Sequence, residues 1–533
     1  MVLKIAAAAS AYFPKEYTVH VVTAIVAIII ARVISQGRKT TRERDLHARV
    51  ILLTGGFTPF GLTLLESLAK RGAHVIALTP YDVESEGVST YINLLRSETS
   101  NEQIFAETCD LSSPPSIHAF GARFAKNQEQ RIDAVVFTHE YRHLGIMGRP
   151  NSKEIEAQRE QGALATFLLT TLLLPVLLTA PAERDIRLIN VVNRFYPAAI
   201  PSFGDTKSFA FSEPTATKRG SFLAEGVRAL RTVVFTRHLQ RILDALPNAA
   251  PLPKPTEQNA APVPVVRPGS SQRSNIVAVS VSPGLSRAET IAPLLGASTG
   301  GTVFGLITYA LLYPFLFVFA KSAGASIETV LHALFLPTPF KILSAEEHPK
   351  DSGEDREVLK PGALYAECAV VRVPMRVEEE TAAEAAASAP EKAPEGSGKE
   401  ELKMPDDREF GGEVLGRRVW EAYEKGLREW NEANPSPPPN RAFLNQIGSR
   451  NDTCRTRETP CGWSQMRSEI LSVPSLGQRK HSDCTSSSAP IFLDLLRHFP
   501  AYFAGAGRRF SSNISDPCVA LAYDANRCDA YSR

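Results

Sequence analysis

The chain has 533 residues, and its 59 basic and 57 acidic residues leave a formal net charge of +2. A charge so close to zero gives no overall attraction to nucleic acid, so we expect no nucleic-acid partner. The seven cysteines form no CxxC pair and have no histidine at zinc-ligand spacing, which predicts neither a metal site nor a secreted disulfide framework.

A short N-terminal segment, 1–16, comes first. The first predicted element follows it: the apolar run YTVHVVTAIVAIIIA begins at Tyr17, and the apolar stretch continues to residue 34. A helix over 17–34 can cross a hydrocarbon core, because that takes about 17 to 25 residues. Basic residues follow it, which places its C-terminal side in the cytosol by the positive-inside rule. We expect a single-pass protein of the endoplasmic reticulum membrane whose domain faces the cytosol; a mitochondrion is the alternative.

Residues 49–372 alternate between β-rich runs and helical patterns. RVILLTGG, AHVIAL, IDAVVFTH, IRLINVVN and NIVAVSVSPG are typical of strands, and INLLRSE and IFAETCDL continue the alternation. Helical patterns include FGLTLLESLAKRG, IHAFGARFAKNQ and two longer stretches that begin near Glu154 and Phe222. Strands that alternate with helices predict an α/β fold, a Rossmann-like doubly wound parallel sheet.

The remaining segments differ in composition. A Pro/Ala-rich insertion is predicted at 247–273, a disordered acidic linker at 377–405, a C-terminal helix at 408–432 and a mostly disordered tail at 434–533. A second apolar run, 303–320, has Pro314 in its middle, which disfavours a second span. We expect it to be a helix that is partly buried in the domain and lies with one face on the bilayer.

A glycine-rich turn, TGGFTPFG, connects the first strand to the first helix of this alternation. Backbone amides at such a turn approach a diphosphate closely, and the helix dipole favours its negative charge. The strand before the turn and the helix after it are the context that supports a dinucleotide site. We therefore predict that Thr54, Gly55, Phe57 and Gly61 contact a cofactor; a structural turn without a ligand is the alternative.

At this turn the sequence resembles the short-chain dehydrogenase/reductase superfamily, and the resemblance covers 49–245 and 274–372. Within that superfamily it resembles an uncharacterised, membrane-anchored fungal branch that is retinol-dehydrogenase-like. The family motif is TGxxxGxG, and Pro59 replaces its middle glycine, which removes one amide. The resemblance implies NADP or NAD as cofactor. It also assigns contacts with the cofactor to Thr79, Asp110, Leu111, Thr138, Pro283 and Gly284.

Two of these assignments carry further information. Thr79 stands where an NAD-preferring member has an acid that holds the ribose hydroxyls, which favours NADP. Asp110 follows the third strand, where the family contacts adenine, and a helix N-terminal cap is the alternative interpretation.

The resemblance also shows that the usual catalytic residues are missing. No YxxxK motif occurs, and Ser221, Glu225 and Asn193 stand at the tyrosine, lysine and serine positions. Candidate substitute proton donors are His139, whose ordinary pKa suits the task, and Tyr196. The alternatives are a hydrogen-bonded residue at a strand end for His139 and a loop residue for Tyr196.

Two functions are compatible with these observations. One is a membrane-bound, NADP-dependent oxidoreductase that reduces a lipid-like carbonyl, such as a ketosteroid, retinoid or ketoacyl group, with a non-standard proton donor. The other is a pseudo-enzyme, a Rossmann scaffold for cofactor sensing or for binding protein partners at a membrane, to which long disordered tails are suited.

Overall fold

The structure, a computed structural model, describes residues 18–126, 131–142, 145–146, 153–180, 184–203, 211, 220–246, 275–298, 301–339, 357–375 and 407–435. The predicted segment 1–16, the insertion 247–273, the linker 377–405 and all but the first two residues of the tail 434–533 lie outside these ranges.

The centre of the fold is a sheet in the order β3-β2-β1-β4-β5-β6-β7-β8. Every neighbouring pair is parallel except β7 and β8, which form an antiparallel hairpin at one edge. The predicted α/β fold with a parallel sheet is thereby confirmed, and the antiparallel edge strand is an addition that the alternating pattern did not reveal. The strands are β1 (Val50–Thr54), β2 (His74–Thr79), β3 (Ile104–Thr108), β4 (Ala134–Phe137), β5 (Ile186–Val191), β6 (Ile276–Ser282), β7 (Leu364–Ala366) and β8 (Ala369–Val371).

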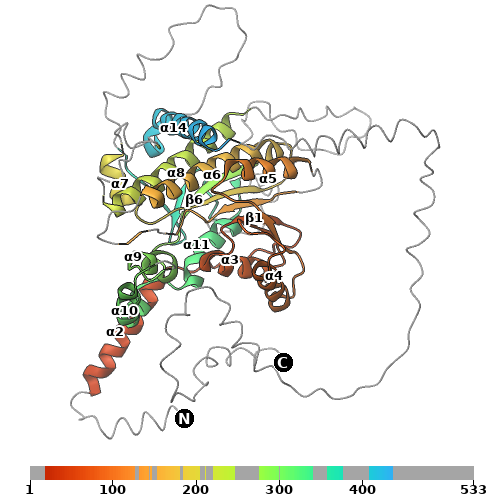
Figure 1. Ribbon diagram of the computed structural model, residues 1–533. Helices are drawn as coiled ribbons and strands as arrows, with labels where there is room; N and C mark the ends of the chain where they lie inside the picture. The colour runs from red at the N-terminus through yellow and green to blue at the C-terminus, as the bar shows by residue number, and fades with distance from the viewer. Residues whose placement is uncertain are drawn as a thin grey trace, which may run out of the picture. The chain divides into compact units, whose positions relative to one another are not determined.

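Helices cover both faces of the sheet, which explains why the inner strands are buried on both sides (Figure 1). One face packs against α3 (Pro59–Ala69), α4 (Glu86–Thr99) and α11 (Ala323–Phe335). The other packs against α5 (Pro114–Lys126), α6 (Lys153–Leu178) and α8 (Ser221–Ala245). Short helical turns lie in the loops: α7 (Tyr196–Ala199), η2 (Ile200–Ser202), the π-helical η5 (Arg287–Ile291) and α9 (Ala292–Leu294).

A further helix, α14 (Gly412–Ala433), packs on the outside of α6 and α8 after a single 3-10 turn, η6 (Glu409–Gly411). Its Tyr423 ring stacks on Phe167 of α6 with centroids 5.2 Å apart and lies equally close to Phe235 of α8. A Cβ at Gly416 would lie 2.5 Å from the Nδ1 of His238, so the absence of a side chain there allows α14 to approach α8 closely. The C-terminal helix thus forms a third layer over this face.

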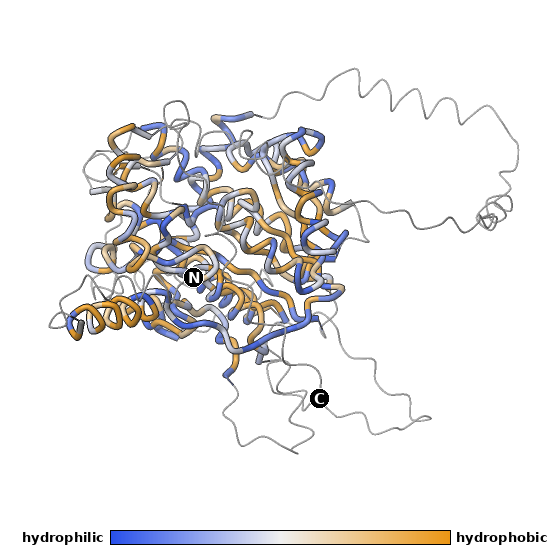
Figure 2. The backbone as a smooth tube through the Cα atoms, turned by 90° about the horizontal axis from the view of Figure 1, so that it is seen from below, coloured by the Kyte–Doolittle hydropathy of each residue, from blue (hydrophilic) through white to orange (hydrophobic). Residues whose placement is uncertain are grey.

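Two apolar helices, α2 (Thr18–Gln36) and α10 (Val303–Phe319), contact each other near their C-terminal ends. The guanidinium of Arg32 stacks 3.8 Å from the Phe317 ring centroid, and the Gln36 amide donates to the Ala320 carbonyl at 3.2 Å. Most of their apolar side chains are exposed. The backbone coloured by hydropathy accordingly includes an outlying helical segment that is apolar along most of its length (Figure 2).

Length and composition allow two of the described helices to cross a membrane: α2 from Val19 to Gln36, and α6. The apolar stretch of α6 is more than half buried and belongs to the core, whereas that of α2 is wholly unburied. The expected N-terminal apolar helix is therefore present and exposed.

Candidate functional site

The carboxyl ends of β1, β4, β5 and β6 lie side by side at one edge of the sheet, and the loops that follow them carry most of the predicted site residues. Thr54 at the end of β1 pairs with Phe137 of β4, which places Thr138 and His139 beside the glycine-rich turn. In open α/β sheets ligands bind in the crevice at this edge, so the topology brings the candidate residues to the expected place.

The turn after β1 is tight because glycines allow close backbone contacts. Gly55 has a φ of +65°, a conformation that favours glycine. A Cβ at Gly61 would lie 2.1 Å from the Gly55 carbonyl oxygen. Thr58 caps α3: its hydroxyl accepts from the Gly61 amide at 3.0 Å and donates to the Gly55 carbonyl at 2.9 Å. The structure thus brings Thr54, Gly55 and Gly61 together, and Phe57 packs partly buried against the core.

Glu289, which sequence reasoning missed, also lies at this turn. It belongs to η5, after β6, and its Oε1 accepts from the Phe60 amide at 3.1 Å, at the N-terminus of α3. The side chain is 3% exposed, and the guanidinium Nε of Arg142 lies 3.9 Å from its Oε2. The pKa of Glu289 is raised, because the effect of burial exceeds those of the Phe60 amide and Arg142, which lower it. A carboxylate of the chain itself therefore meets the helix end that the predicted diphosphate would use.

His139 has hydrogen-bond partners on both ring nitrogens. Nδ1 lies 2.8 Å from the Thr54 hydroxyl, and Nε2 lies 3.0 Å from the Gly162 carbonyl oxygen and 3.2 Å from the Thr166 hydroxyl. Because a carbonyl only accepts, Nε2 carries a hydrogen, and Nδ1 of the neutral ring accepts from Thr54. Burial lowers the pKa of His139, which agrees with a neutral ring. Thr138 also bonds to this strand end, donating from its hydroxyl to the Thr54 carbonyl at 2.5 Å.

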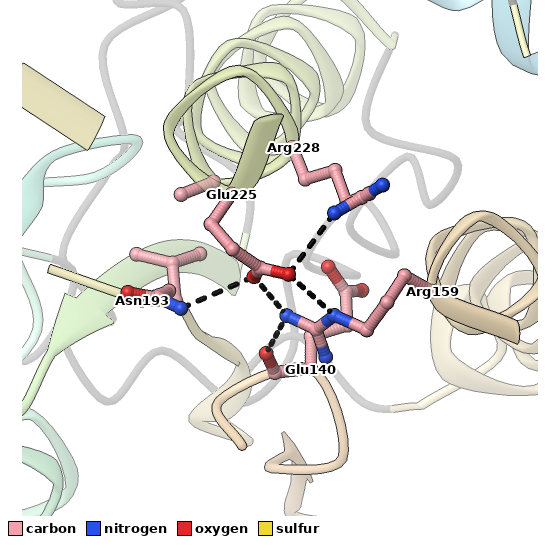
Figure 3. Close-up of a pocket in the computed structure, with 7 residues that line it drawn as sticks. Glu140, Arg159, Asn193, Glu225 and Arg228 are labelled. Carbon is pink, nitrogen blue, oxygen red and sulfur yellow. Dashed lines mark hydrogen bonds and ion pairs between the residues drawn. The ribbon is translucent and has the colours of Figure 1, made fainter. Parts of the chain in front are cut away.

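Glu225, at the family's lysine position, lies at the centre of a buried ion-pair network (Figure 3). It is fully buried and forms a two-bond ion pair with Arg159 of α6, in which Nε donates to Oε1 at 3.0 Å. Arg228, one turn along α8, donates to the same oxygen at 3.0 Å. Asn193, at the serine position, donates its amide to Oε2 at 3.2 Å. Four hydrogen bonds thus converge on this carboxylate.

The network extends outward between α6 and α8. Arg228 also pairs with Glu160 at 2.9 Å and with Glu156, and Arg231 pairs with Glu160. Glu140, after β4, accepts hydrogen bonds from Thr166 and Thr232, and its backbone carbonyl accepts from Arg159. The cavity that remains beside Glu225 measures about 10 Å³, which is room for about one water molecule. The side chains beside Glu225 therefore leave no room for a group larger than water.

Tyr196, the second candidate proton donor, lies at the start of α7 and is 8% exposed. Its side chain belongs to the hydrophobic cluster on the α8 face. Burial raises its pKa, and the nearby Arg194 lowers it. A raised pKa is the opposite of what a tyrosine needs to donate a proton to a developing alkoxide near neutral pH.

The residues predicted to hold the adenosine have partners within their own loops. Oδ1 of Asp110 accepts from the Ser112 amide at 2.9 Å and from the Ser112 hydroxyl at 2.7 Å. Leu111 packs against the core. The hydroxyl of Thr79, which is fully buried, accepts from the Tyr81 amide at 3.2 Å. These bonds resemble the capping and turn contacts that were the alternative interpretation of Asp110.

Pro283 and Gly284 follow β6 and also bond within the chain. The Lys321 ammonium donates to the Pro283 carbonyl at 2.8 Å and pairs with Glu367 at 2.7 Å. The Tyr141 hydroxyl donates to the Gly284 carbonyl at 3.0 Å. The roles that the sequence suggested for these residues in binding, and for His139 and Tyr196 in catalysis, stay predictions.

The sequence of the chain is similar to those of several known oxidoreductases. No known family model matches it. The uncharacterized oxidoreductase pbr1 of Schizosaccharomyces pombe is 25% identical over 305 residues, which cover 57% of this chain and 74% of that protein. An uncharacterized oxidoreductase of Saccharomyces cerevisiae is 30% identical over 315 residues, covering 57% of this chain and 71% of that protein. Retinol dehydrogenase 12 of Mus musculus is 27% identical over 210 residues, covering 39% of this chain and 60% of that protein.

The chain belongs to the short-chain dehydrogenase/reductase superfamily. The resemblance to fungal and retinol-dehydrogenase-like members is thereby confirmed. The chain is therefore an oxidoreductase of the short-chain dehydrogenase/reductase type. The departures from the family motifs that the sequence predicted are Pro59 at the glycine-rich turn and Asn193, Ser221 and Glu225 at the catalytic positions.

The family implies a nicotinamide dinucleotide, so the fit of this group can be tested against the turn. A diphosphate needs unpaired amides at the first turn of α3. Pro59 has none, Phe60 donates to Glu289, and Gly61 donates to Thr58. The residues present therefore do not fit the diphosphate in the arrangement that the structure describes.

Proposed function

We propose that the chain is a membrane-anchored short-chain dehydrogenase/reductase scaffold that has lost dehydrogenase turnover and binds protein partners at a membrane. The observation that carries the proposal is the network around Glu225, which fills the catalytic position with buried, mutually neutralising charges. The sheet and its helices would then serve as a rigid surface for binding partners, not as an active site.

The chemistry of the described groups supports this proposal. Reduction of a carbonyl needs a proton donor whose pKa lies near the working pH, with a cation that stabilises its conjugate base. Glu225 supplies a negative charge at the cation's place, and its lone pairs are engaged by Arg159, Arg228 and Asn193. His139 uses both nitrogens in hydrogen bonds. Tyr196, the other candidate donor, has a pKa that burial raises.

The exposed helices α2 and α10 support the membrane part of the proposal. The 19 residues of α2 carry one formal charge, that of Arg32, and span about 28 Å as a helix, which matches a hydrocarbon core of about 30 Å. The 17 residues of α10 carry none, and Phe304 and Leu311 are more than three-quarters exposed. We propose that α2 crosses the bilayer once and that α10 lies against it.

The same reasoning gives an orientation. Arg38 and Lys39 follow α2 and are exposed, so the positive-inside rule keeps the domain on the cytosolic side. We propose the endoplasmic reticulum as the membrane, with a mitochondrial membrane as the alternative. Fluorescent tagging of the full chain, followed by protease protection of the tag, tests both the organelle and the side.

A second function is favoured by one comparison. The similarity to a protein named retinol dehydrogenase favours an NADP-dependent reductase of a lipid-like carbonyl, such as a retinoid, ketosteroid or ketoacyl group. In that case His139 or Tyr196 would donate the proton, and α10 would guide the apolar substrate from the bilayer.

Turnover separates the two functions. The full chain is reconstituted in phospholipid nanodiscs and supplied with NADPH or NADH and with retinaldehyde, a ketosteroid or a ketoacyl thioester. We expect no cofactor oxidation above the rate without substrate. Turnover that is lost in His139→Gln or Tyr196→Phe, but kept in the exposed control Tyr81→Phe, would establish the reductase and end the scaffold proposal.

A further inference from the structure

The first turn of α3 has no free hydrogen-bond donor. Pro59 has no amide hydrogen, and the Phe60 amide donates to Glu289 Oε1 at 3.1 Å. The Gly61 amide donates to the Thr58 hydroxyl at 3.0 Å, and the Leu62 amide donates to the Thr58 carbonyl at 2.8 Å. A helix normally leaves such amides for a cap or a ligand. Here the chain itself satisfies all of them.

Of these internal partners, Glu289 alone brings a negative charge. Its segment is held in place by a cap of its own, in which the Ser286 hydroxyl accepts from the Glu289 amide at 3.0 Å. The carboxylate is 3% exposed, so water screens its charge poorly. One carboxylate oxygen faces the Phe60 amide, and the other faces Arg142. A carboxyl oxygen of the chain is therefore fixed where the helix dipole is most positive.

We propose that the Glu289 carboxylate takes the place of a dinucleotide's phosphate at the N-terminus of α3 and so excludes NADP and NAD from this chain. The inference goes beyond the proposed loss of turnover, because it concerns the binding of the cofactor rather than proton transfer. A phosphate at this helix end would lie close to the Glu289 carboxylate, and the two like charges would repel each other through a poorly screened interior.

The other end of the crevice agrees with this inference. The Asp110 carboxylate accepts from two groups of Ser112, and the Thr79 hydroxyl accepts from the Tyr81 amide. The groups that the resemblance assigns to adenine and ribose are therefore engaged within their own loops. A dinucleotide would therefore meet engaged groups at its adenosine as well as at its diphosphate.

Two substitutions of Glu289 distinguish the effect of its negative charge from the effect of its volume. Glu289→Gln keeps the size of the side chain and an oxygen that accepts from Phe60, but it removes the charge. Glu289→Ala removes both and leaves the Phe60 amide free for a phosphate. The matched control is Glu86→Ala, which removes an exposed acid from the first turn of α4.

Calorimetric titration of the full chain in nanodiscs with NADPH tests the proposal. We expect no binding to the wild type or Glu86→Ala at about 1 mM NADPH, and binding at least tenfold tighter by Glu289→Ala, with Glu289→Gln between them. Thermal unfolding checks that each variant is folded, and Glu289→Ser replaces Glu289→Ala if the latter is not.

Two results would overturn the proposal. Binding of NADPH by the wild type well below about 1 mM would show that Glu289 does not exclude it. A folded Glu289→Ala or Glu289→Ser variant that binds no better than the wild type would show that something else fills the site. Binding by the wild type without turnover would remove this inference and leave the proposed scaffold function standing.

Discussion

Replacing Glu225 by glutamine tests the buried network directly. Glu225→Gln keeps the shape of the side chain but removes the negative charge between Arg159 and Arg228, each 3.0 Å from its Oε1. The two guanidiniums are 7% and 5% exposed, so water cannot replace the lost carboxylate. The carboxamide also turns an NH₂ group toward groups that only donate.

The expected loss of stability is large. Breaking a buried ion pair by removing one partner costs about 3–5 kcal/mol, because the remaining charge stays buried and uncompensated. With a shift of about 2–4 °C per kcal/mol for domains of 150–250 residues, the melting temperature of Glu225→Gln should fall by roughly 6–20 °C. Glu225→Lys, which restores the family's residue, should fall further because it adds a third cation to this site.

Thermal unfolding of the full chain in nanodiscs, followed by circular dichroism, measures this effect. The control is Glu66→Gln, which removes one partner of the exposed pair with Lys70 and should cost less than about 1 kcal/mol. If Glu225→Gln melted within about 2 °C of that control, the charges around Glu225 would be solvated rather than sealed, and the scaffold proposal would lose its main support.

Three further outcomes are expected. Gly61→Ala should destabilise the domain by more than about 1 kcal/mol in urea unfolding, because its Cβ would lie 2.1 Å from a backbone oxygen. Burial, together with the charges of Arg241 and Arg417, lowers the pKa of His238 to about 4 in the folded chain. In the unfolded chain this pKa is about 6.5, so between pH 4 and about 6.5 only the unfolded chain holds a proton on His238. Stability should therefore fall as the pH falls through that window, by at most about 1.4 kcal/mol per pH unit for this group, and less steeply in His238→Gln. Ile28→Lys near the middle of α2 should cost about 3 kcal/mol of membrane insertion and raise the fraction that alkaline carbonate extracts.

The fold could be predicted because its information is local. The runs that became β1, β4, β5 and β6 are short, apolar and separated by helices, a pattern that is typical of a parallel sheet. The short β8 gave no such signal, because three residues at a sheet edge need no long apolar run.

The site could be predicted only in part, because its decisive contacts join distant segments. Glu225 lies 66 residues from Arg159 along the chain, and Glu289 lies 229 from Phe60. One signal was nonetheless present: Glu225, Arg228 and Arg231 recur every third residue, which places them on one side of α8. Such a charged row in an otherwise buried helix indicates oppositely charged partners on a facing helix, which α6 supplies.

The outer layer formed by α14 has a consequence for how the protein is made. Gly412 lies 41 residues after Val371, the last residue of the sheet, yet Tyr423 and Trp430 are among the buried residues of the core. When the ribosome has synthesised the last strand, α14 does not yet exist. The aromatic side chains of α6 and α8 that it covers are then still exposed to solvent. Until the later helix arrives, that surface is a natural substrate for chaperones, and a chain that stops before it is exposed to aggregation.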